Sequence, residues 1–332
     1  MVNAEKGPSL LLPLPPRSEA RAAFLKRTRH LCLPIMLTDD ILRLKKERNA
    51  VILAHNYQPG EVQDVADLRG DSLELSRAAA GEEAEVIVFC GVDFMAETAA
   101  ILSPEKRVIM PEAGAGCPMA HMITGQELRE FKAEHPGAAI VCYVNSSAEV
   151  KAESDICCTS ANGIEVVESL EEETVLFVPD RNLGRYVARF TDKKIITWDG
   201  YCYVHDRYTT EDVRRARALH PEAELLVHPE CRPEVIDLAD HVYSTSGIAR
   251  HAKKSPVREF IIGTEVGMNY RLKQENPDKE FYPLSERAIC ADMKKTSLEK
   301  VLSALEALEP RVVVPKEIAD RARGAIERML AV

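Results

Sequence analysis

The sequence predicts an α/β protein built from three similar units whose parallel sheets are covered by helices on both faces. A polar pattern occurs three times, with a Glu-Val pair beginning at residues 61, 149 and 234 and an Asp six residues after each Glu. One cysteine follows each copy, and Cys117, Cys202 and Cys290 are 85 and 88 residues apart. Self-similarity at a fixed period indicates a repeated structural unit. Three such units around a common axis would bring the three cysteines together.

The first unit shows the alternation of strands and helices expected of this class. Short apolar runs predict strands at 50–54, 86–90 and 107–110, and the segments between them predict helices at 59–68, 72–80 and 96–102. Strands that alternate with helices form parallel sheets. Since ligands of such sheets bind outside the carboxyl ends of the strands, we expect the site in the polar loops that follow them.

The other two units follow the same order. Strands are predicted at 139–144, 175–178 and 194–197 in the second unit, and at 224–227, 259–262 and 280–282 in the third. Residues 316–330 carry apolar side chains at helical spacing, which predicts an amphipathic helix packed on one of the units. Residues 1–38 lie outside the repeat, and a short basic helix is expected at 18–29.

The composition excludes several classes of protein. The chain has 332 residues and a net charge of −10, which argues against a nucleic-acid binder and against a polybasic membrane anchor. No apolar stretch reaches the roughly 20 residues that a membrane span needs, and the N-terminus does not have the pattern of a signal peptide. We therefore expect a cytoplasmic protein, whose nine cysteines are thiols or metal ligands rather than disulfides.

The three regularly spaced cysteines differ from the others because each ends a polar loop. Three thiolates suit zinc or an iron–sulfur cluster. They are one ligand short of a closed site, so a metal held by them keeps an open position, which favours catalysis. An iron with an open position can act as a Lewis acid on a bound substrate. The cysteines in apolar surroundings are expected to be ordinary core residues: Cys32, Cys90, Cys142 and Cys157.

The loop after the first strand of each unit carries groups suited to proton transfer. These are His55 with Tyr57 in the first unit, Tyr143 with Asn145 in the second, and His228 with Glu230 in the third. A single His or Tyr after a strand is more often a structural hydrogen-bonding group. Here the repeat would direct three such loops at one centre, and imidazole, phenol and carboxylate are the groups of general acid–base catalysis.

Hydroxyl side chains lie where a following helix begins in each unit: Ser72, Thr159-Ser160 and Ser244-Thr245. Hydroxyls and backbone N–H groups at helix starts bind carboxylates or phosphates. Simple N-capping would select the same residue types. Lys294 and Lys295 are candidates for the positive charge of such a site, although exposed lysine pairs are usually solvated surface.

A second regularity places an acid after one strand of each unit. Asp93, Asp180 and Glu265 precede the three cysteines by 24, 22 and 25 residues. This regularity supports the threefold repeat.

Several longer motifs occur in a fixed order along the chain. They are Ala54-His55-Asn56-Tyr57-Gln58, Gly70-Asp71-Ser72-Leu73, Gly91-Val92-Asp93-Phe94-Met95-Ala96-Glu97, Cys117-Pro118-Met119-Ala120, Tyr143-Val144-Asn145-Ser146, Thr159-Ser160-Ala161-Asn162, Pro179-Asp180-Arg181-Asn182-Leu183-Gly184, His228-Pro229-Glu230-Cys231, Ser244-Thr245 and Gly263-Thr264-Glu265. In these motifs the chain resembles the quinolinate synthase family, over about residues 40–332. It departs from some relatives at Met293 and Thr296, where they carry cysteines, and at Tyr201, where many carry His.

The resemblance implies three similar three-layer α/β/α domains around a pseudo-threefold axis. It implies one [4Fe–4S] cluster per chain, held by Cys117, Cys202 and Cys290, whose open iron would bind a substrate hydroxyl or carboxylate as a Lewis acid. The implied reaction of NAD biosynthesis is a transferase step that condenses iminoaspartate with dihydroxyacetone phosphate to quinolinate, with loss of phosphate and water. Functional coupling to L-aspartate oxidase is implied as well.

The resemblance also assigns residues to the site. Implied to line it are His55, Tyr57, Ser72, Tyr143, Asn145, Ser160, His205, His228, Glu230, Ser244 and Thr245. Glu230 and Tyr57 are the candidates for proton transfer. His55, His228 and the hydroxyls would position the phosphate and carboxylates of the substrates.

The implied organisation is an N-terminal extension at 1–38, a first unit at 39–118 packed with C-terminal helices at 292–332, a second unit at 119–203 and a third at 204–291. The residues themselves leave alternatives open. These are another iron–sulfur hydro-lyase acting on a hydroxy acid, a non-catalytic iron–sulfur sensor, and a zinc enzyme.

Overall fold

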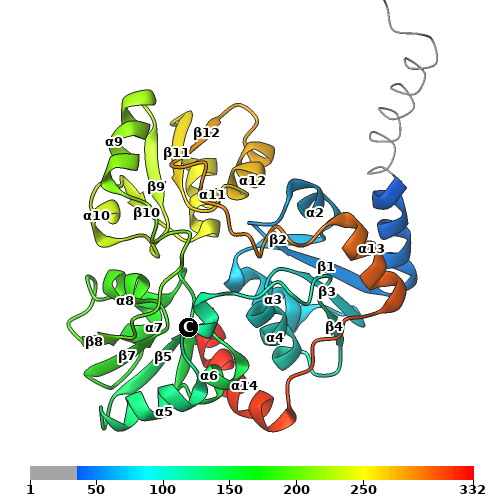
Figure 1. Ribbon diagram of the computed structural model, residues 1–332, viewed down its shortest axis with the longest axis horizontal. Coiled ribbons are helices and arrows are strands. Elements are labelled where there is room, and N and C mark those ends of the chain that lie inside the picture. The colour runs from blue at the N-terminus through cyan, green and yellow to red at the C-terminus, as the bar shows by residue number, and fades with distance from the viewer. Residues whose placement is uncertain (1–35) are drawn as a thin grey trace, which may run out of the picture.

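Three α/β units surround one centre in the computed structural model, which describes residues 36–332 (Figure 1). The helix expected at 18–29 and Cys32 lie outside these residues. Each unit contains one four-stranded, wholly parallel sheet, as the apolar strand pattern predicted. The expected class of three similar α/β units is confirmed.

The first unit follows helical residues 36–47 and has the strand order β2-β1-β3-β4. Its strands are β1 Ala50–His55, β2 Leu68–Gly70, β3 Val86–Cys90 and β4 Arg107–Ile109. Its helices are α2 Gly60–Val65, α3 Ser72–Gly81 and α4 Asp93–Leu102.

The second unit repeats this order as β6-β5-β7-β8, and the third as β10-β9-β11-β12. The second contains the 3₁₀ helix Met119–His121, α5 Gly125–Ala133, β5 Ala139–Tyr143, α6 Ala148–Ala152, β6 Ile156–Cys158, α7 Gly163–Glu168, β7 Thr174–Val178, α8 Arg181–Val187 and β8 Lys194–Thr197. The third contains α9 Thr210–Leu219, β9 Glu224–Val227, α10 Pro233–Ile236, β10 His241–Val242, α11 Thr245–Lys254, β11 Glu259–Gly263, α12 Met268–Glu275 and β12 Glu280–Pro283.

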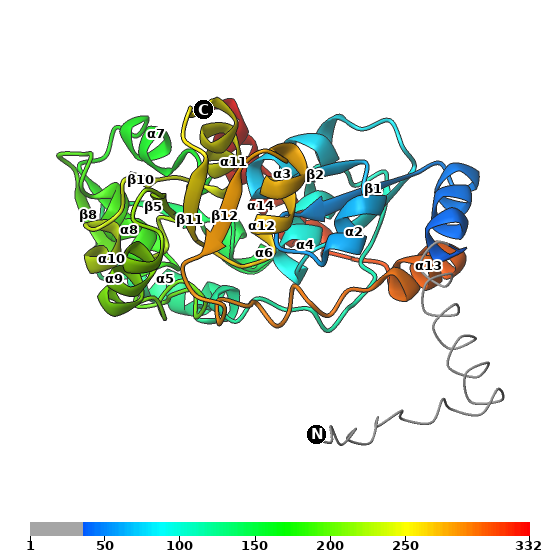
Figure 2. The same cartoon turned by 90° about the horizontal axis from the view of Figure 1, so that it is seen from above.

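The sheets are buried on both faces, which explains their continuous apolar strands. In β1, Val51 and Leu53 pack into one apolar cluster and Ile52 and Ala54 into another on the opposite face, because successive strand side chains point to opposite sides. Helices α3 and α4 lie on the side facing the second unit, whereas α13, Leu298–Ala307, covers the outer side (Figures 1 and 2).

The repeated Asp of the sequence pattern has a structural role in every unit. The carboxylates of Asp67, Asp155 and Asp240 accept a hydrogen bond from a backbone N–H of β1, β5 and β9, at 2.8, 2.8 and 2.7 Å. Each carboxylate also pairs with a Lys or Arg at 2.6 to 3.1 Å. In each unit the Asp therefore holds the segment that leads into the short edge strand against the first strand of the sheet.

These edge strands, β2, β6 and β10, are the strands that the sequence did not predict. They have only two or three residues, which is too short for a periodic pattern to be recognised. The helix expected at 59–68 ends at Val65 to make room for β2, and the helix expected at 96–102 begins earlier, at Asp93.

The strand order places a topological switch point between the first and third strands of each unit, where chain connections leave in opposite directions. At or just after the carboxyl ends of these two strands lie His55, Tyr143 and His228 for one strand and Asp93, Asp180 and Glu265 for the other. The polar loops of all three units therefore lie where an open α/β sheet binds its ligands.

The two C-terminal helices pack on different units. We expected residues 292–332 to pack with the first unit, and α13 does contact β3 there. Helix α14, Lys316–Ala331, instead contacts α6 and β6 of the second unit and α4 of the first. None of the helices in the described part of the chain is long and apolar enough to cross a membrane.

We predict that Ile326→Ala destabilises the protein by about 2–5 kcal/mol, because it leaves a cavity in the wholly buried face of α14. Denaturant unfolding measures the change. Glu327→Ala, on the exposed face of the same turn, is the control and should change the free energy of unfolding by no more than about 0.5 kcal/mol. Equal effects of the two substitutions would contradict the packing described for this helix.

Candidate functional site

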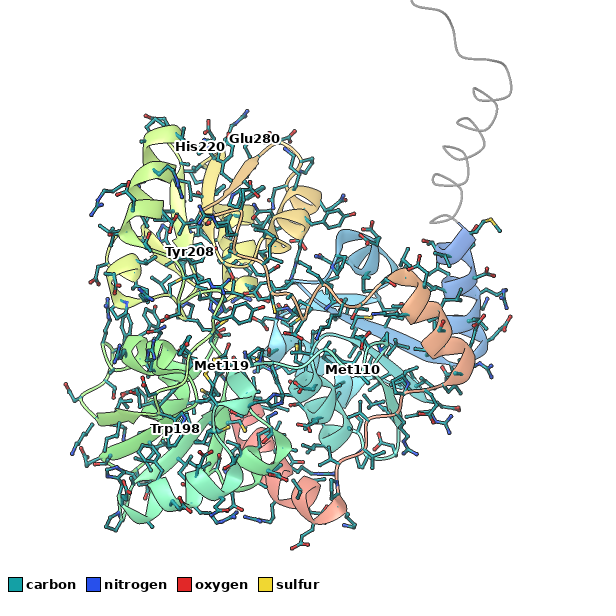
Figure 3. All side chains as sticks on the ribbon, viewed as in Figure 1. Met110, Met119, Trp198, Tyr208, His220 and Glu280 are labelled. Carbon is teal, nitrogen blue, oxygen red and sulfur yellow. The ribbon has the colours of Figure 1, made fainter. Side chains whose placement is uncertain are left out.

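One cavity at the centre of the molecule is lined by residues from all three units. All three regularly spaced cysteines line it, and so does Met119 near the middle of Figure 3. The space between its walls is about 690 Å³, including its opening to solvent. Of the other residues expected at the site, the cavity is lined by His55, Tyr57, Ser72, Tyr143, Asn145, Ser160, His205, His228, Glu230 and Thr245.

Each cysteine loop is held by the same hydrogen bond. The backbone N–H groups of Cys117, Cys202 and Cys290 donate to the carboxylates of Asp93, Asp180 and Glu265, each at 3.2 Å. This explains the second regularity of the sequence, in which an acid precedes each cysteine at nearly constant distance. The acid at the end of one strand fixes the loop that returns after the next strand.

The three acids are stabilised differently. The Asp93 carboxylate lies 3.1 Å from His121 Nε2, and that of Glu265 lies 3.0 Å from Lys294 Nζ. Asp180 is fully buried and accepts from the backbone N–H of Leu183 at 2.8 Å, while burial raises its pKa well above the usual range. Within the described residues 36–332, only backbone groups therefore hold the acid of the second unit.

The donor set fits a thiophilic metal group. Burial raises the pKa of Cys117, Cys202 and Cys290, so the thiols become thiolates only beside a strong positive charge. Three soft donors from three separate loops, fixed through their backbone and open toward one cavity, match an iron–sulfur cluster with one iron left for a substrate.

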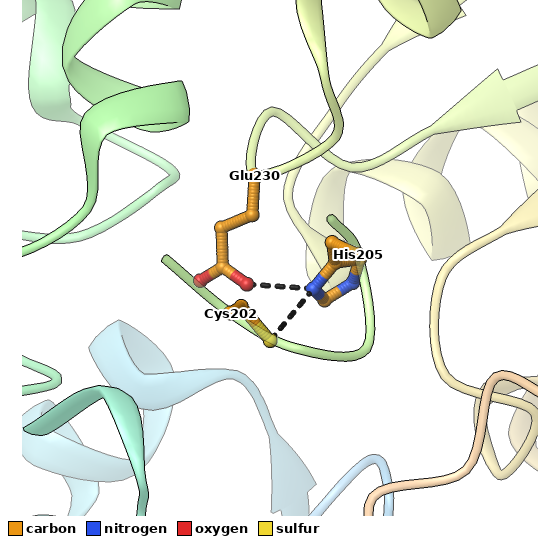
Figure 4. A group of neighbouring side chains, drawn as sticks. All are labelled: Cys202, His205 and Glu230. Carbon is orange, nitrogen blue, oxygen red and sulfur yellow. Dashed lines mark hydrogen bonds and ion pairs between the residues drawn. The ribbon is translucent and has the colours of Figure 1, made fainter. Parts of the chain in front are cut away.

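Glu230 lines the cavity beside His205 and Cys202 (Figure 4). Its carboxylate accepts from Tyr143 Oη at 2.5 Å and lies 2.7 Å from His205 Nδ1, which in turn is 3.2 Å from Cys202 Sγ. Burial raises the pKa of Glu230, but His228, His205 and the hydrogen bond from Tyr143 outweigh it and lower the pKa to about 2. The group is therefore a carboxylate at neutral pH.

A hydrogen-bonded chain continues from Glu230 through a residue that we did not expect at the site. His205 Nε2 lies 2.8 Å from the Thr264 hydroxyl, which is 2.6 Å from Tyr57 Oη. With Nδ1–H donating to the Glu230 carboxylate, His205 Nε2 accepts from the Thr264 hydroxyl, and the Thr264 oxygen then accepts from Tyr57. The chain runs from Tyr57 of the first unit to Tyr143 of the second.

The other two histidines are fixed as neutral donors. The Nδ1 atoms of His55 and His228 accept from the backbone N–H groups of Tyr57 and Glu230, at 3.2 and 3.3 Å. Burial lowers the pKa of His55 to about 4 and that of His228 to about 3. Both rings therefore carry their proton on Nε2. The Nε2 atom of His228 lies 3.2 Å from Ser160 Oγ.

The hydroxyl groups divide into cavity and capping residues. Asp71 caps α3 and Ser244 caps α11, so Ser72 and Thr245, the first helical residues, do not serve as the N-caps. Ser244 does not line the cavity, and its hydroxyl donates to Asp71 at 3.2 Å. In both helices the N-cap and the cavity hydroxyl are thus neighbouring residues.

The cavity wall provides polar donors rather than cations. Among the described lining residues there is no Lys or Arg. Lys294 binds the Glu265 carboxylate and the backbone oxygen of Tyr57, and Lys295 binds Gly114 and Asp292. Asn145 Oδ1 is buried without a hydrogen-bond partner among residues 36–332, which suits a donor group of a ligand.

A buried acid–base chain beside three convergent thiols, in one cavity of an α/β protein, defines an enzyme active site. Residues 39–331 match the model of the family described as quinolinate synthetase A protein. The chain is 64% identical to a quinolinate synthase of Methanoregula boonei, over 89% of this chain and 98% of the relative, and 61% identical to one of Dehalococcoides mccartyi, over 90% and 98%. The chain belongs to the quinolinate synthetase A family.

We predict that Thr264→Val lowers kcat about 10- to 100-fold, the loss typical when a partner that orients a functional group is removed. Valine keeps the shape of the side chain but cannot connect Tyr57 with His205. Thr264→Ser, which keeps the hydroxyl, is the matched control and should retain most of the activity. Steady-state kinetics that give equal kcat values for both variants would argue against the hydrogen-bonded chain.

Proposed function

We propose that the protein is a quinolinate synthase that condenses iminoaspartate with dihydroxyacetone phosphate and releases quinolinate, phosphate and water. Membership of the quinolinate synthetase A family supports this proposal. The observation that carries it is the single cavity in which three thiols from three units surround an ionised Glu230 and a chain of proton-carrying groups.

We propose Cys117, Cys202 and Cys290 as the ligands of one [4Fe–4S] cluster. Such a cluster, when bound, supplies an iron with an open coordination position that polarises a substrate oxygen as a Lewis acid. The position of all three cysteines in the wall of one cavity and the backbone hydrogen bonds that hold their loops support this assignment.

Glu230 is our candidate for the general base. It is ionised and accepts hydrogen bonds from both His205 and Tyr143, so its carboxylate can take a proton from the substrate. From His205 the chain continues to Thr264 and Tyr57. Burial raises the pKa of Tyr57 well above its usual range, so we assign Tyr57 as a proton donor.

We assign substrate positioning to neutral donors. The Nε2–H groups of His55 and His228 are suited to carboxylate or phosphate oxygens, with the hydroxyls of Ser72, Ser160 and Thr245. Ser72 and Thr245 begin helices of ten residues each, whose N-terminal N–H groups and dipoles favour an anion. Tyr143 and Asn145 complete the proposed substrate site.

The substrate chemistry suggests how the protein operates in the cell. An imine hydrolyses in water, so we propose functional coupling to the L-aspartate oxidase that would produce it. We also propose a cytoplasmic location, and the division of the repeat into units at 39–118, 119–203 and 204–291.

Glu230→Gln is expected to bind both substrates and to lower kcat about 100- to 10,000-fold, because glutamine keeps the size of the side chain but cannot take a proton. Iron and sulfide per chain should equal those of the unchanged protein, which separates a catalytic from a structural effect. Turnover near normal in this variant would exclude Glu230 as the proton carrier.

Purification without oxygen should give about four irons and four sulfides per chain, and quinolinate should form from iminoaspartate only when dihydroxyacetone phosphate is present. Cys202→Ser should lose both cluster and activity, whereas Cys90→Ser, in the core of β3, should keep the iron content. A protein that holds four irons but forms no quinolinate would instead be another hydro-lyase or a sensor. Zinc found in place of iron would contradict the proposed cluster.

A further inference from the structure

Two imidazoles and a carboxylate converge in the third unit, away from the central cavity. Glu224 is the first residue of β9, His241 is the first residue of β10, and His251 lies in the last turn of α11. One ligand atom of each residue lies within 4.8 Å of the other two. None of the three lines the catalytic cavity.

The fold brings these side chains to one face of the sheet. Glu224 and Leu226 are two residues apart in β9 and so point to the same side. His241 is the register partner of Leu226 in the neighbouring strand, which places its side chain on that side as well. Helix α11 packs on this face through Ile248, which shares an apolar cluster with Leu226. His251, three residues further along α11, then reaches the same edge.

The local contacts leave one imidazole without a charge partner. His251 Nε2 lies 2.8 Å from Glu224 Oε2. The rings of His241 and His251 are 4.3 Å apart between centroids, yet within residues 36–332 the only hydrogen bond of the His241 ring is a long contact of 3.5 Å from Nδ1 to Tyr243 Oη. An ion pair between Glu224 and one histidine accounts for the position of His251. It does not account for the position of His241 beside them.

The group is also partly protected from water. The side chains of His251 and Glu224 are 20% and 26% exposed, which leaves an opening for a small ion. The third unit's catalytic residues, His228 and Glu230, follow the carboxyl end of β9, whereas Glu224 starts its amino end. Four strand residues span about 13 Å, so the two groups lie at opposite ends of the same strand.

We infer that Glu224, His241 and His251 form a binding site for a divalent transition-metal ion, with Zn²⁺ as the best fit. Two imidazole nitrogens and one carboxylate oxygen are ligands of the kind that Zn²⁺ binds in tetrahedral sites, and a water completes the fourth position. An oxygen-only set would suit Mg²⁺ or Ca²⁺, and this set does not.

A metal ion at this site has a clear structural consequence. It ties the two-residue strand β10 and the end of α11 to β9. The other end of α11 begins with Thr245, which accepts from Asn56 at 2.8 Å and lines the catalytic cavity. The ion therefore stabilises the third unit and holds the helix that supplies part of the cavity wall.

The test is zinc binding by the full chain, prepared without oxygen so that the central cysteines keep whatever group they carry. After dialysis with Zn²⁺ and removal of loosely bound metal, the unchanged protein should retain one zinc per chain more than the double variant His241→Ala/His251→Ala. Its thermal unfolding temperature should rise with zinc concentration, and that of the double variant should not. Because both chains share all cysteines, the difference reports on this site alone.

Two further variants guard against an effect of misfolding. Glu224→Gln keeps the size of the side chain and should weaken zinc binding in a calorimetric titration at least about tenfold. His220→Ala, at the outer edge of the same unit (Figure 3), removes a histidine outside the group and should leave the zinc count unchanged. Equal zinc in all four proteins, or binding by the unchanged protein only at millimolar zinc, would overturn the inference.

Discussion

The site depends on one repeated interaction, the hydrogen bond from a cysteine backbone N–H to the acid of its own unit. Three residues separated by 85 and 88 positions in the chain must be brought to one cavity and kept there. An intramolecular hydrogen bond contributes about 0.5–1.5 kcal/mol to stability, and each cysteine loop has one such bond to an acid that is itself anchored at the end of a strand. Each acid thus fixes the position of its cysteine relative to the parallel sheet of the same unit.

The centre of the molecule is also where the units are joined. Tyr143 of the second unit donates to Glu230 of the third, and Asn56 of the first donates to Thr245 of the third. Between the first and second units, Glu97 of α4 accepts from the backbone N–H of Ala148 at the start of α6. Buried hydrogen bonds of this kind are costly to break without replacement. The contacts that build the cavity are therefore also the contacts that hold the three units together.

The sequence predicted the repeat because its signals recur at constant spacing. The convergence of Cys117, Cys202 and Cys290 on one cavity followed from the period alone, and the residues of the three polar loops lie where the parallel sheets required. Thr264 was not recognised as part of the site, since a threonine beside a buried acid has no distinctive pattern before its neighbours in space are known. The same holds for Lys294, whose charge is used by Glu265, a contact between residues 29 positions apart.

Helix α14 constrains the order in which parts of the chain can fold during synthesis. The apolar side of this helix, with Ala322, Ala325, Ile326 and Met329, belongs to the same core as residues of the second unit such as Val150 and Ile156. A ribosome makes the strands of that unit long before it makes residues 316–331, and domains in general fold as units while synthesis proceeds from the N-terminus. The middle of this chain cannot finish its core in that way, because the helix that covers it is made only after the third unit. Completion of the second unit, and of the cavity that it helps to form, therefore waits for the synthesis of residues 316–331.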